Sequence, residues 1–151
     1  RMALSAELLT GADFVTVPSS FTGNMIKKQV PELNVKVIKH GMDYSGVKRQ
    51  TKKYNKNDII NFGFVGSIQE HKGVHILFDT FMKVKNKNIK LLVFGDCSES
   101  YAKKMKQRTK NDDRISFYGS FKSDIIERIY NQIDVLIIPS LCYESYSLVK
   151  H

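Results

Sequence analysis

The chain alternates short, continuous apolar runs with amphipathic segments, and this alternation constrains its fold more than any other feature. The clearest run is 135–138, Val-Leu-Ile-Ile, which Pro139 ends because proline has no N–H to give to a strand ladder. Such a run is typical of a strand buried on both faces of a parallel sheet. Three strand–helix units precede it, with strands over 59–65, 89–94 and 115–118 and helices over 73–85, 99–110 and 123–132. This order predicts an α/β fold, a Rossmann-like doubly wound parallel sheet.

The first part of the chain shows the same pattern on a smaller scale. Ser19 or Ser20 can cap a helix that runs to about Gln29, because a serine hydroxyl accepts a hydrogen bond from an unpaired N–H of the first turn. The other elements expected here are a helix over 3–9 and strands over 13–17 and 35–38.

A single acid follows the last apolar run. Glu144 lies in a short polar loop, at what should be the carboxyl end of a parallel strand. Ligands of open α/β sheets bind at that edge, where a carboxylate can accept hydrogen bonds from a polyhydroxyl ligand. From this segment alone, a carboxylate that merely caps the next helix is an equally good interpretation.

A lysine–glycine pair precedes the helix of the first strand–helix unit. The apolar positions Val74, Leu77, Phe78 and Phe81 have helical spacing, so a helix begins near residue 73 and places Lys72 at its N-terminus. The helix dipole disfavours a cation there by a few tenths to ~1 kcal/mol. A cation, a glycine that allows close backbone approach and free helix N–H groups together form a phosphate site. A plain surface lysine is the competing interpretation.

Composition limits the class of protein. With 151 residues and 42% hydrophobic content, the chain can form one core but is too short for two complete domains. Apolar segments stay far below the ~20 residues that span a bilayer, and no signal peptide is visible. Cys97 and Cys142 lack metal-ligand spacing and suit a reducing, cytoplasmic compartment. We interpret Cys142 as a small, nearly buried hydrophobic residue.

The net charge of +9 admits three interpretations. Lysines cluster over 48–56, 83–87 and 103–110, and the second and third clusters end helices, where lysine meets the helix dipole favourably. Solvated helix ends are therefore the first interpretation. Weak attraction to an anionic membrane surface, such as the inner face of a membrane, is the second. Binding to nucleic acid is the third. We expect no such partner, since no recognition motif accompanies the clusters.

Several segments together resemble the GT-B glycosyltransferases of family four, also called glycosyl transferases group 1. Gly66-Ser-Ile-Gln-Glu-His-Lys72-Gly73-Val is similar to their strand–loop–Lys-Gly–helix element, and Pro139 through Leu148 resembles the start of their E-x7-E motif. The segments 39–43, 93–96 and 115–119 are similar to further family turns, in the family's order. The resemblance covers about residues 12–151.

The resemblance implies a division of the chain and two departures from the family. Residues 1–40 would be the end of the acceptor domain with its hinge, and 41–151 an incomplete nucleotide-sugar donor-binding domain, with the polar tract 41–57 as linker. Ser67 stands where the family usually has arginine, so one cation on the donor diphosphate is missing. The second glutamate of the motif would fall one residue beyond His151, and the final helices of the domain would be absent.

By this resemblance the chain is part of a retaining transferase that moves a hexose-type sugar to a glycan or lipid-linked acceptor. Lys72 and Glu144 would be catalytic, the first on the diphosphate and the second on the sugar hydroxyls. We find no Asp-x-Asp or clustered acids suited to a divalent ion and expect no metal or other cofactor. Acceptor-domain residues without their sheet, such as Phe14, Phe21 and Ile26, would favour self-association. The implied donor-binding residues are Gly66, Ser67, Lys72, Gly73, Gly95, Gly119, Ser120, Phe121, Glu144, Tyr146, Ser147 and Leu148.

Two other functions compete with this one. A Rossmann dinucleotide domain is disfavoured, because the residues around Gly66 do not fit G-x-G-x-x-G and no acid ends a second strand about 20 residues later. A non-catalytic basic module that binds nucleotides or nucleic acid is the main alternative, and a steep salt dependence of its affinity would identify it.

Overall fold

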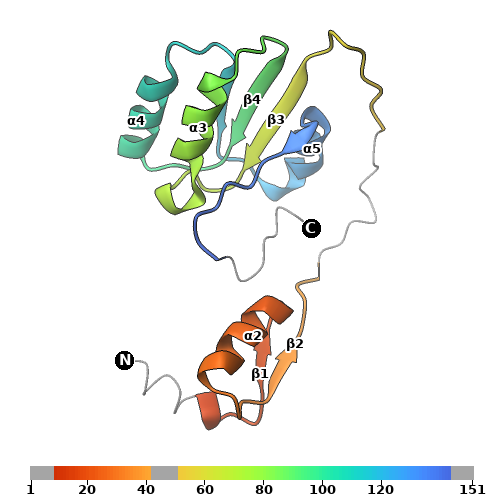
Figure 1. The fold of residues 1–151 in the computed structure, drawn as a ribbon, viewed down its shortest axis with the longest axis vertical. Helices are drawn as coiled ribbons and strands as arrows, with labels where there is room; N and C mark the ends of the chain where they lie inside the picture. Colours follow the sequence, from red (N-terminus) through yellow and green to blue (C-terminus); the bar gives the residue numbers. More distant parts are fainter. Residues whose placement is uncertain (1–8, 42–50, 144–151) are drawn as a thin grey trace. The chain divides into compact units, whose positions relative to one another are not determined.

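A computed structural model describes residues 9–41 and 51–143 of the chain. The described residues fall into two compact units that separate between residues 41 and 51. Each unit is an α/β arrangement with parallel strands (Figure 1). The expected helix over 3–9 lies almost wholly outside the described residues.

The smaller unit is a β–α–β element. Strands β1 (Val15–Val17) and β2 (Val35–Val37) pair in parallel, and helix α2 (Ser20–Gln29) connects them. Ser19 caps α2, its side-chain oxygen accepting a hydrogen bond of 3.2 Å from the backbone N–H of Thr22. Gly23 is the buried residue of α2, and its lack of a side chain lets the helix lie close to the valines of both strands. The predicted helix that ends at Gln29 and the two predicted strands are confirmed, although the strands are shorter than the expected 13–17 and 35–38.

The larger unit contains a four-stranded parallel sheet with the order β5-β4-β3-β6. Strands β3 (Ile60–Val65) and β4 (Ile89–Phe94) form its centre, and β5 (Ile115–Gly119) pairs with the outer side of β4. The chain steps from β3 to β4 to β5 in one direction and then returns to place β6 (Val135–Leu136) on the other side of β3. This is the predicted doubly wound sheet, with its change of direction between β3 and β6.

Two helices cover one face of this sheet. Helix α3 (Val74–Lys83) buries its apolar stripe, as its helical spacing predicted, and α4 (Glu99–Thr109) buries Met105. Their buried side chains form one core with Phe64, Leu91 and Val93 of the central strands. Figure 1 shows α3 and α4 side by side next to the sheet.

The opposite face of the sheet is covered near β3 by helix α5 (Ile126–Gln132), which follows the 3₁₀ turn η2 (Ser123–Ile125). Gly63 points to this face, since successive residues of a strand alternate between faces and Phe64 belongs to the other core. A Cβ placed on Gly63 would overlap the Ile133 side chain, which follows α5. Gly63 therefore makes room for the segment that returns the chain to β6.

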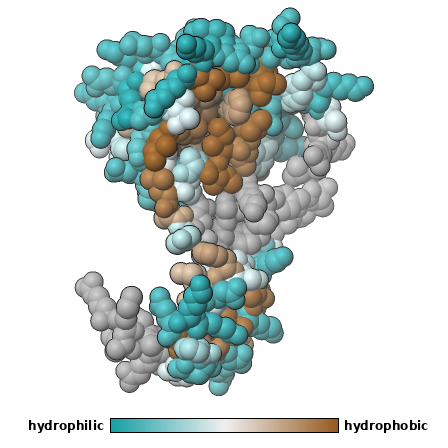
Figure 2. Space-filling view, in the orientation of Figure 1, coloured by the Kyte–Doolittle hydropathy of each residue, from teal (hydrophilic) through white to brown (hydrophobic). Residues whose placement is uncertain are grey.

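The sequence prediction for β6 was partly wrong. The strand covers 135–136 rather than 135–138, and Val135 and Ile138 are exposed rather than buried on both faces. The physical reason is position, because within 51–143 β6 pairs only with β3 and forms an edge of the sheet. Figure 2 shows an apolar surface beside α3, where β3 and β6 lie.

Two arginines fix the helices and loops of the larger unit. Arg114 is buried and donates hydrogen bonds to the carboxylate of Asp112. It also donates to the carbonyl oxygens of Val84 and Asn86, each at 2.7 Å, just beyond the end of α3. Arg108 of α4 forms a bidentate ion pair with Asp79 of α3. In the described part of the chain, no helix is long and apolar enough to cross a membrane.

Candidate functional site

Four glycines mark the carboxyl edge of the sheet. Gly66, Gly95 and Gly119 stand at the ends of β3, β4 and β5, and Gly73 directly precedes α3. These are the glycines with positive φ in the described residues, and the sequence prediction placed all four at the site. The ends of β3, β4 and β5 on this edge therefore each have a glycine in a backbone conformation that other residues rarely adopt.

Backbone hydrogen bonds hold these strand ends together. The N–H of Gly66 donates to the carbonyl oxygen of Phe94 at 3.0 Å, and the N–H of Gly95 donates to that of Gly119 at 2.8 Å. A Cβ on Gly95 would overlap the carbonyl oxygen of Gly66, so only glycine permits this close approach. Backbone contacts thus join the ends of β3, β4 and β5, with Gly95 buried between a half-buried Gly66 and an exposed Gly119.

The turn before α3 has a defined shape. Residues Glu70–Lys72 form the 3₁₀ turn η1, and Gly73 adopts a left-handed conformation with φ of 69°. The predicted helix start near residue 73 is therefore confirmed, with α3 beginning at Val74. Lys72 is half-buried in this turn, and the first N–H groups of α3 follow it. The turn has the cation, the glycine and the helix N-terminus that the phosphate-site prediction required.

The segment that follows β6 lies directly against this turn. The N–H of Leu141 donates a hydrogen bond of 2.9 Å to the carbonyl oxygen of His71. Gly73 is buried, and a Cβ there would overlap the carbonyl oxygen of Pro139. The loops after β3 and β6 therefore meet at the point where the sheet changes direction, which is where open α/β sheets bind ligands.

Three further residues of the predicted site follow the ends of β3 and β5. Ser67 follows Gly66 and is half-buried; Ser120 is exposed and Phe121 half-buried after the end of β5. Phe121 is not among the residues of the hydrophobic core. The remaining predicted residues lie outside the described residues, and these are Glu144, Tyr146, Ser147 and Leu148.

The two cysteines differ from each other. Cys142 is exposed, so its interpretation as a nearly buried residue was wrong; it lies beyond β6 in the loop, where no strand covers it. Cys97 is half-buried, and its thiol lies 3.3 Å from the carbonyl oxygen of Ile68, to which it donates. Burial, with a smaller effect from Asp96, raises the pKa of the Cys97 thiol, which keeps it protonated and suits this bond.

A second polar cluster lies at the opposite, amino edge of the sheet, and sequence reasoning did not find it. Asp134 accepts hydrogen bonds from Lys52 Nζ at 2.5 Å, from the Tyr54 hydroxyl at 2.7 Å and from the Asn61 backbone N–H at 2.8 Å. Burial alone would raise the pKa of Asp134, but these hydrogen bonds outweigh it and the pKa is lowered. The cluster ties the loop before β3 to the start of β6, which is a structural role. The described residues contain no group of acids, histidines or cysteines that could hold a metal ion.

The larger unit is an α/β domain built on a parallel sheet whose strand order changes direction between β3 and β6. The family model for glycosyl transferases group 1 matches residues 60–150, more than half of the chain, and the chain therefore belongs to this family.

Solved structures share the fold. Anabaena HepE in complex with UDP and glucose has a TM-score of 0.78 at 20% identity, over 98% of this chain and 44% of HepE. Sucrose-phosphate synthase from Thermosynechococcus elongatus has 0.77 at 18% identity, over 98% of this chain and 40% of that one. The lipopolysaccharide outer core galactosyltransferase WaaB, in its apo form, has 0.67 at 17% identity, over 91% and 39%. The chain thus spans less than half the length of these proteins. No curated protein sequence matches it significantly.

Proposed function

We propose that this chain is the donor-binding part of a retaining glycosyltransferase, which transfers a hexose-type sugar from a nucleotide diphosphate to a glycan or lipid-linked acceptor. The observation that carries the proposal is the contact between the turn at His71–Gly73 and the segment Pro139–Leu141. Lys72 belongs to this turn, and Leu141 stands three residues before Glu144 in the sequence. Family membership supports the same assignment.

Lys72 and the N-terminus of α3 would bind the diphosphate. When the bond between the anomeric carbon and the diphosphate oxygen breaks, negative charge develops on the leaving group, and positioned donors stabilise it. The helix N-terminus supplies partial positive charge and free N–H groups, and Lys72 supplies a full charge. Ser67 cannot add a second cation, so more of the leaving-group charge falls to Lys72. In this proposal, these groups do the work that a divalent ion does in other transferases.

The other predicted residues would bind the sugar and the base. Glu144 would accept hydrogen bonds from the sugar hydroxyls and so orient the anomeric carbon towards the acceptor hydroxyl, which loses its proton as the new bond forms. The backbone of Ser147 and Leu148, with Tyr146, would complete the phosphate and sugar contacts. The base would lie against the backbone and the half-buried ring of the segment 119–121.

The HepE complexes contain UDP and UDP-glucose, so uridine donors are the first to test. We place the protein in the cytoplasm. Cys97 and Cys142 are free thiols, which suits a reducing compartment.

A thermal-shift panel tests the proposal on the chain as it stands. UDP-, GDP- and ADP-sugars are compared with NAD and with oligonucleotides, since a ligand that binds the folded state raises the melting temperature. One class of nucleotide sugar should stabilise the chain, and Lys72→Gln should abolish the shift. Lys85→Gln removes an equal charge from an exposed residue beyond the end of α3, and should leave the shift unchanged. Stabilisation by NAD or by oligonucleotides instead would reject the proposal in favour of one of the competing functions.

A further inference from the structure

Helix α4 has an outer surface made of lysines. Its inner side buries Met105 and Thr109 and half-buries Tyr101. Residues three or four apart share one side of a helix. The outer side therefore presents an exposed row of Lys103, Lys106 and Lys110, with exposed Lys104 beside it. Exposed Glu99, four residues before Lys103, begins the same side. We call the four lysines the lysine row.

The lysine row is only partly explained by the stability of the helix. Like charges three or four residues apart destabilise a helix by a few tenths of a kcal/mol per pair. The helix dipole favours Lys106 and Lys110 near the last turn, and Glu99 lies four residues before Lys103, but neither effect compensates Lys104.

The lysines of the row are not engaged in ion pairs. Within 9–41 and 51–143, none of the four forms one, Lys103 included, although Glu99 lies four residues before it. The contrast with Arg108 of the same helix is clear, because Arg108 is committed to Asp79 of α3. Arg108 is thus paired with the neighbouring helix, whereas the four lysines of the row are exposed and form no ion pair.

We propose that the lysine row docks the larger unit onto an anionic phospholipid surface. The three lysines of one side extend over about 10 Å of a straight helix, since the rise is 1.5 Å per residue. This row is suited to a flat surface of negative head groups, and each lysine near such a surface adds to the attraction. The exposed residues of α4 include neither an aromatic ring nor an unpaired arginine, and these are what bind bases in single-stranded nucleic acid. The row therefore favours a membrane over RNA or DNA.

Docking through the lysine row would leave the proposed nucleotide site at the carboxyl edge accessible. Helix α4 lies on the face of the sheet that α3 also covers (Figure 1). A membrane against the outer side of α4 would run along the strands, and would leave the carboxyl edge with Gly66, Lys72 and Gly73 open at the side. The contact is then electrostatic, with no insertion into the acyl region.

Vesicle sedimentation of the full chain tests this inference. The probes are phosphatidylcholine vesicles that contain phosphatidylglycerol, and vesicles of phosphatidylcholine alone, each at low and high salt. We expect binding only to the anionic vesicles, lost at high salt because screening shortens the range of the charges. The triple variant Lys103→Gln, Lys106→Gln, Lys110→Gln should bind on the order of 100-fold more weakly.

A second triple variant controls for net charge. Lys53→Gln, Lys56→Gln, Lys90→Gln removes the same charge from exposed residues outside α4, and it should retain most of the binding. Circular dichroism of both variants checks that α4 is intact. Equal losses in the two variants, equal binding to uncharged vesicles, or tighter row-dependent binding to an RNA or DNA oligonucleotide would each overturn the inference.

Discussion

The backbone N–H of Leu141 donates a hydrogen bond of 2.9 Å to the carbonyl oxygen of His71. These residues are far apart in sequence, and one follows β3 whereas the other follows β6. The bond joins the turn that contains Lys72 to the segment that precedes Glu144. It lies where the strand order of the sheet changes direction, so the proposed diphosphate and sugar contacts share one anchor.

Replacing Gly73 should weaken this anchor. Gly73→Ala places a methyl group against the carbonyl oxygen of Pro139 and also forces alanine into a left-handed conformation with φ of 69°. We expect a loss of about 2–4 kcal/mol in the free energy of unfolding, measured in urea, from backbone strain plus overlap. Gly119→Ala is the matched control, because Gly119 has φ of 77° but no atom within 4 Å of the added Cβ. It should lose only about 1 kcal/mol, and equal losses would show that the Pro139 contact is unimportant.

The two proposed catalytic residues should have separable effects in the full-length parent protein. Lys72→Ala should weaken binding of the bare nucleotide diphosphate by ~1.5–3 kcal/mol, the range for a lost charge-assisted hydrogen bond. Glu144→Ala should reduce turnover and sugar discrimination and leave nucleotide binding nearly intact. Calorimetry with the nucleotide and steady-state kinetics distinguish the two effects. The assignment fails if both variants lose nucleotide affinity equally.

Tyr54, which donates a hydrogen bond to Asp134, should have a raised pKa. The hydrogen bond from Tyr54 to the Asp134 carboxylate, with some burial, raises the pKa of Tyr54 from 10.0 to about 12. A raised pKa favours the protonated tyrosine in the folded state. Its contribution to stability is therefore complete below about pH 10 and is lost as the pH rises towards 12. In an NMR titration of the tyrosine ring carbons, Asp134→Asn should return the pKa of Tyr54 towards 10.0. An unchanged pKa in this variant would contradict the hydrogen bond.

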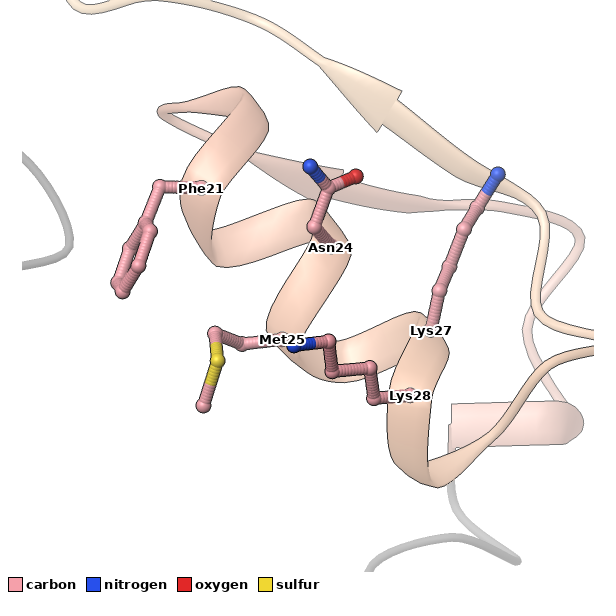
Figure 3. A pocket seen from close by; sticks show the side chains of 5 residues that line it. All are labelled: Phe21, Asn24, Met25, Lys27 and Lys28. Atoms are coloured by element: carbon pink, nitrogen blue, oxygen red, sulfur yellow. The ribbon is translucent and has the colours of Figure 1, made fainter.

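The isolated chain should self-associate. It should also transfer no sugar, because it spans less than half the length of the solved structures that share its fold. In the smaller unit, Phe14 is 55% and Phe21 46% exposed, as expected, whereas Ile26 is half-buried. Figure 3 shows Phe21 and Met25 on the same side of α2, lining a hollow of about 450 Å³ with Asn24, Lys27 and Lys28. Exposed apolar side chains of this kind favour association.

Sedimentation velocity with the double variant Phe21→Ser, Met25→Ser checks this expectation. The variant should shift the chain towards monomer, and Lys27→Ser, Lys28→Ser, which changes neighbouring residues but removes no apolar surface, should not. A stable wild-type monomer would contradict the association. Measurable transfer to any acceptor would contradict the inactivity.

The strands and helices could be predicted where one local pattern decides the structure. The run 89–94 is apolar at nearly every position and forms β4 with those bounds, and the helical spacing of Val74, Leu77, Phe78 and Phe81 gives the buried side of α3. The run 135–138 has the same composition as a central strand. In the described residues, however, β6 lies at an edge of the four-stranded sheet. Edge position depends on strand order, which the residues of one strand do not determine.

The site could be predicted only in part. A glycine after a strand suggests a turn, and Gly66, Gly73, Gly95 and Gly119 all have positive φ. The contact of Gly73 with Pro139 could not be predicted, since it depends on how closely two non-adjacent loops approach. Similarly, the bonds of Asp134 to Lys52 and Tyr54 span about 80 residues and leave no local pattern in the sequence.

A nucleotide diphosphate should bind at the carboxyl edge of the sheet in the larger unit. NMR titration of the ¹⁵N-labelled chain with UDP tests this binding, because weak binding is still visible as amide shifts. We expect saturable shifts that are largest at Gly66, Lys72, Gly73 and Gly119, and that are reduced in Lys72→Gln. Shifts confined to the amino edge, around Asn61, Asn88 and Asp134, or no shifts with UDP, GDP or ADP, would contradict it.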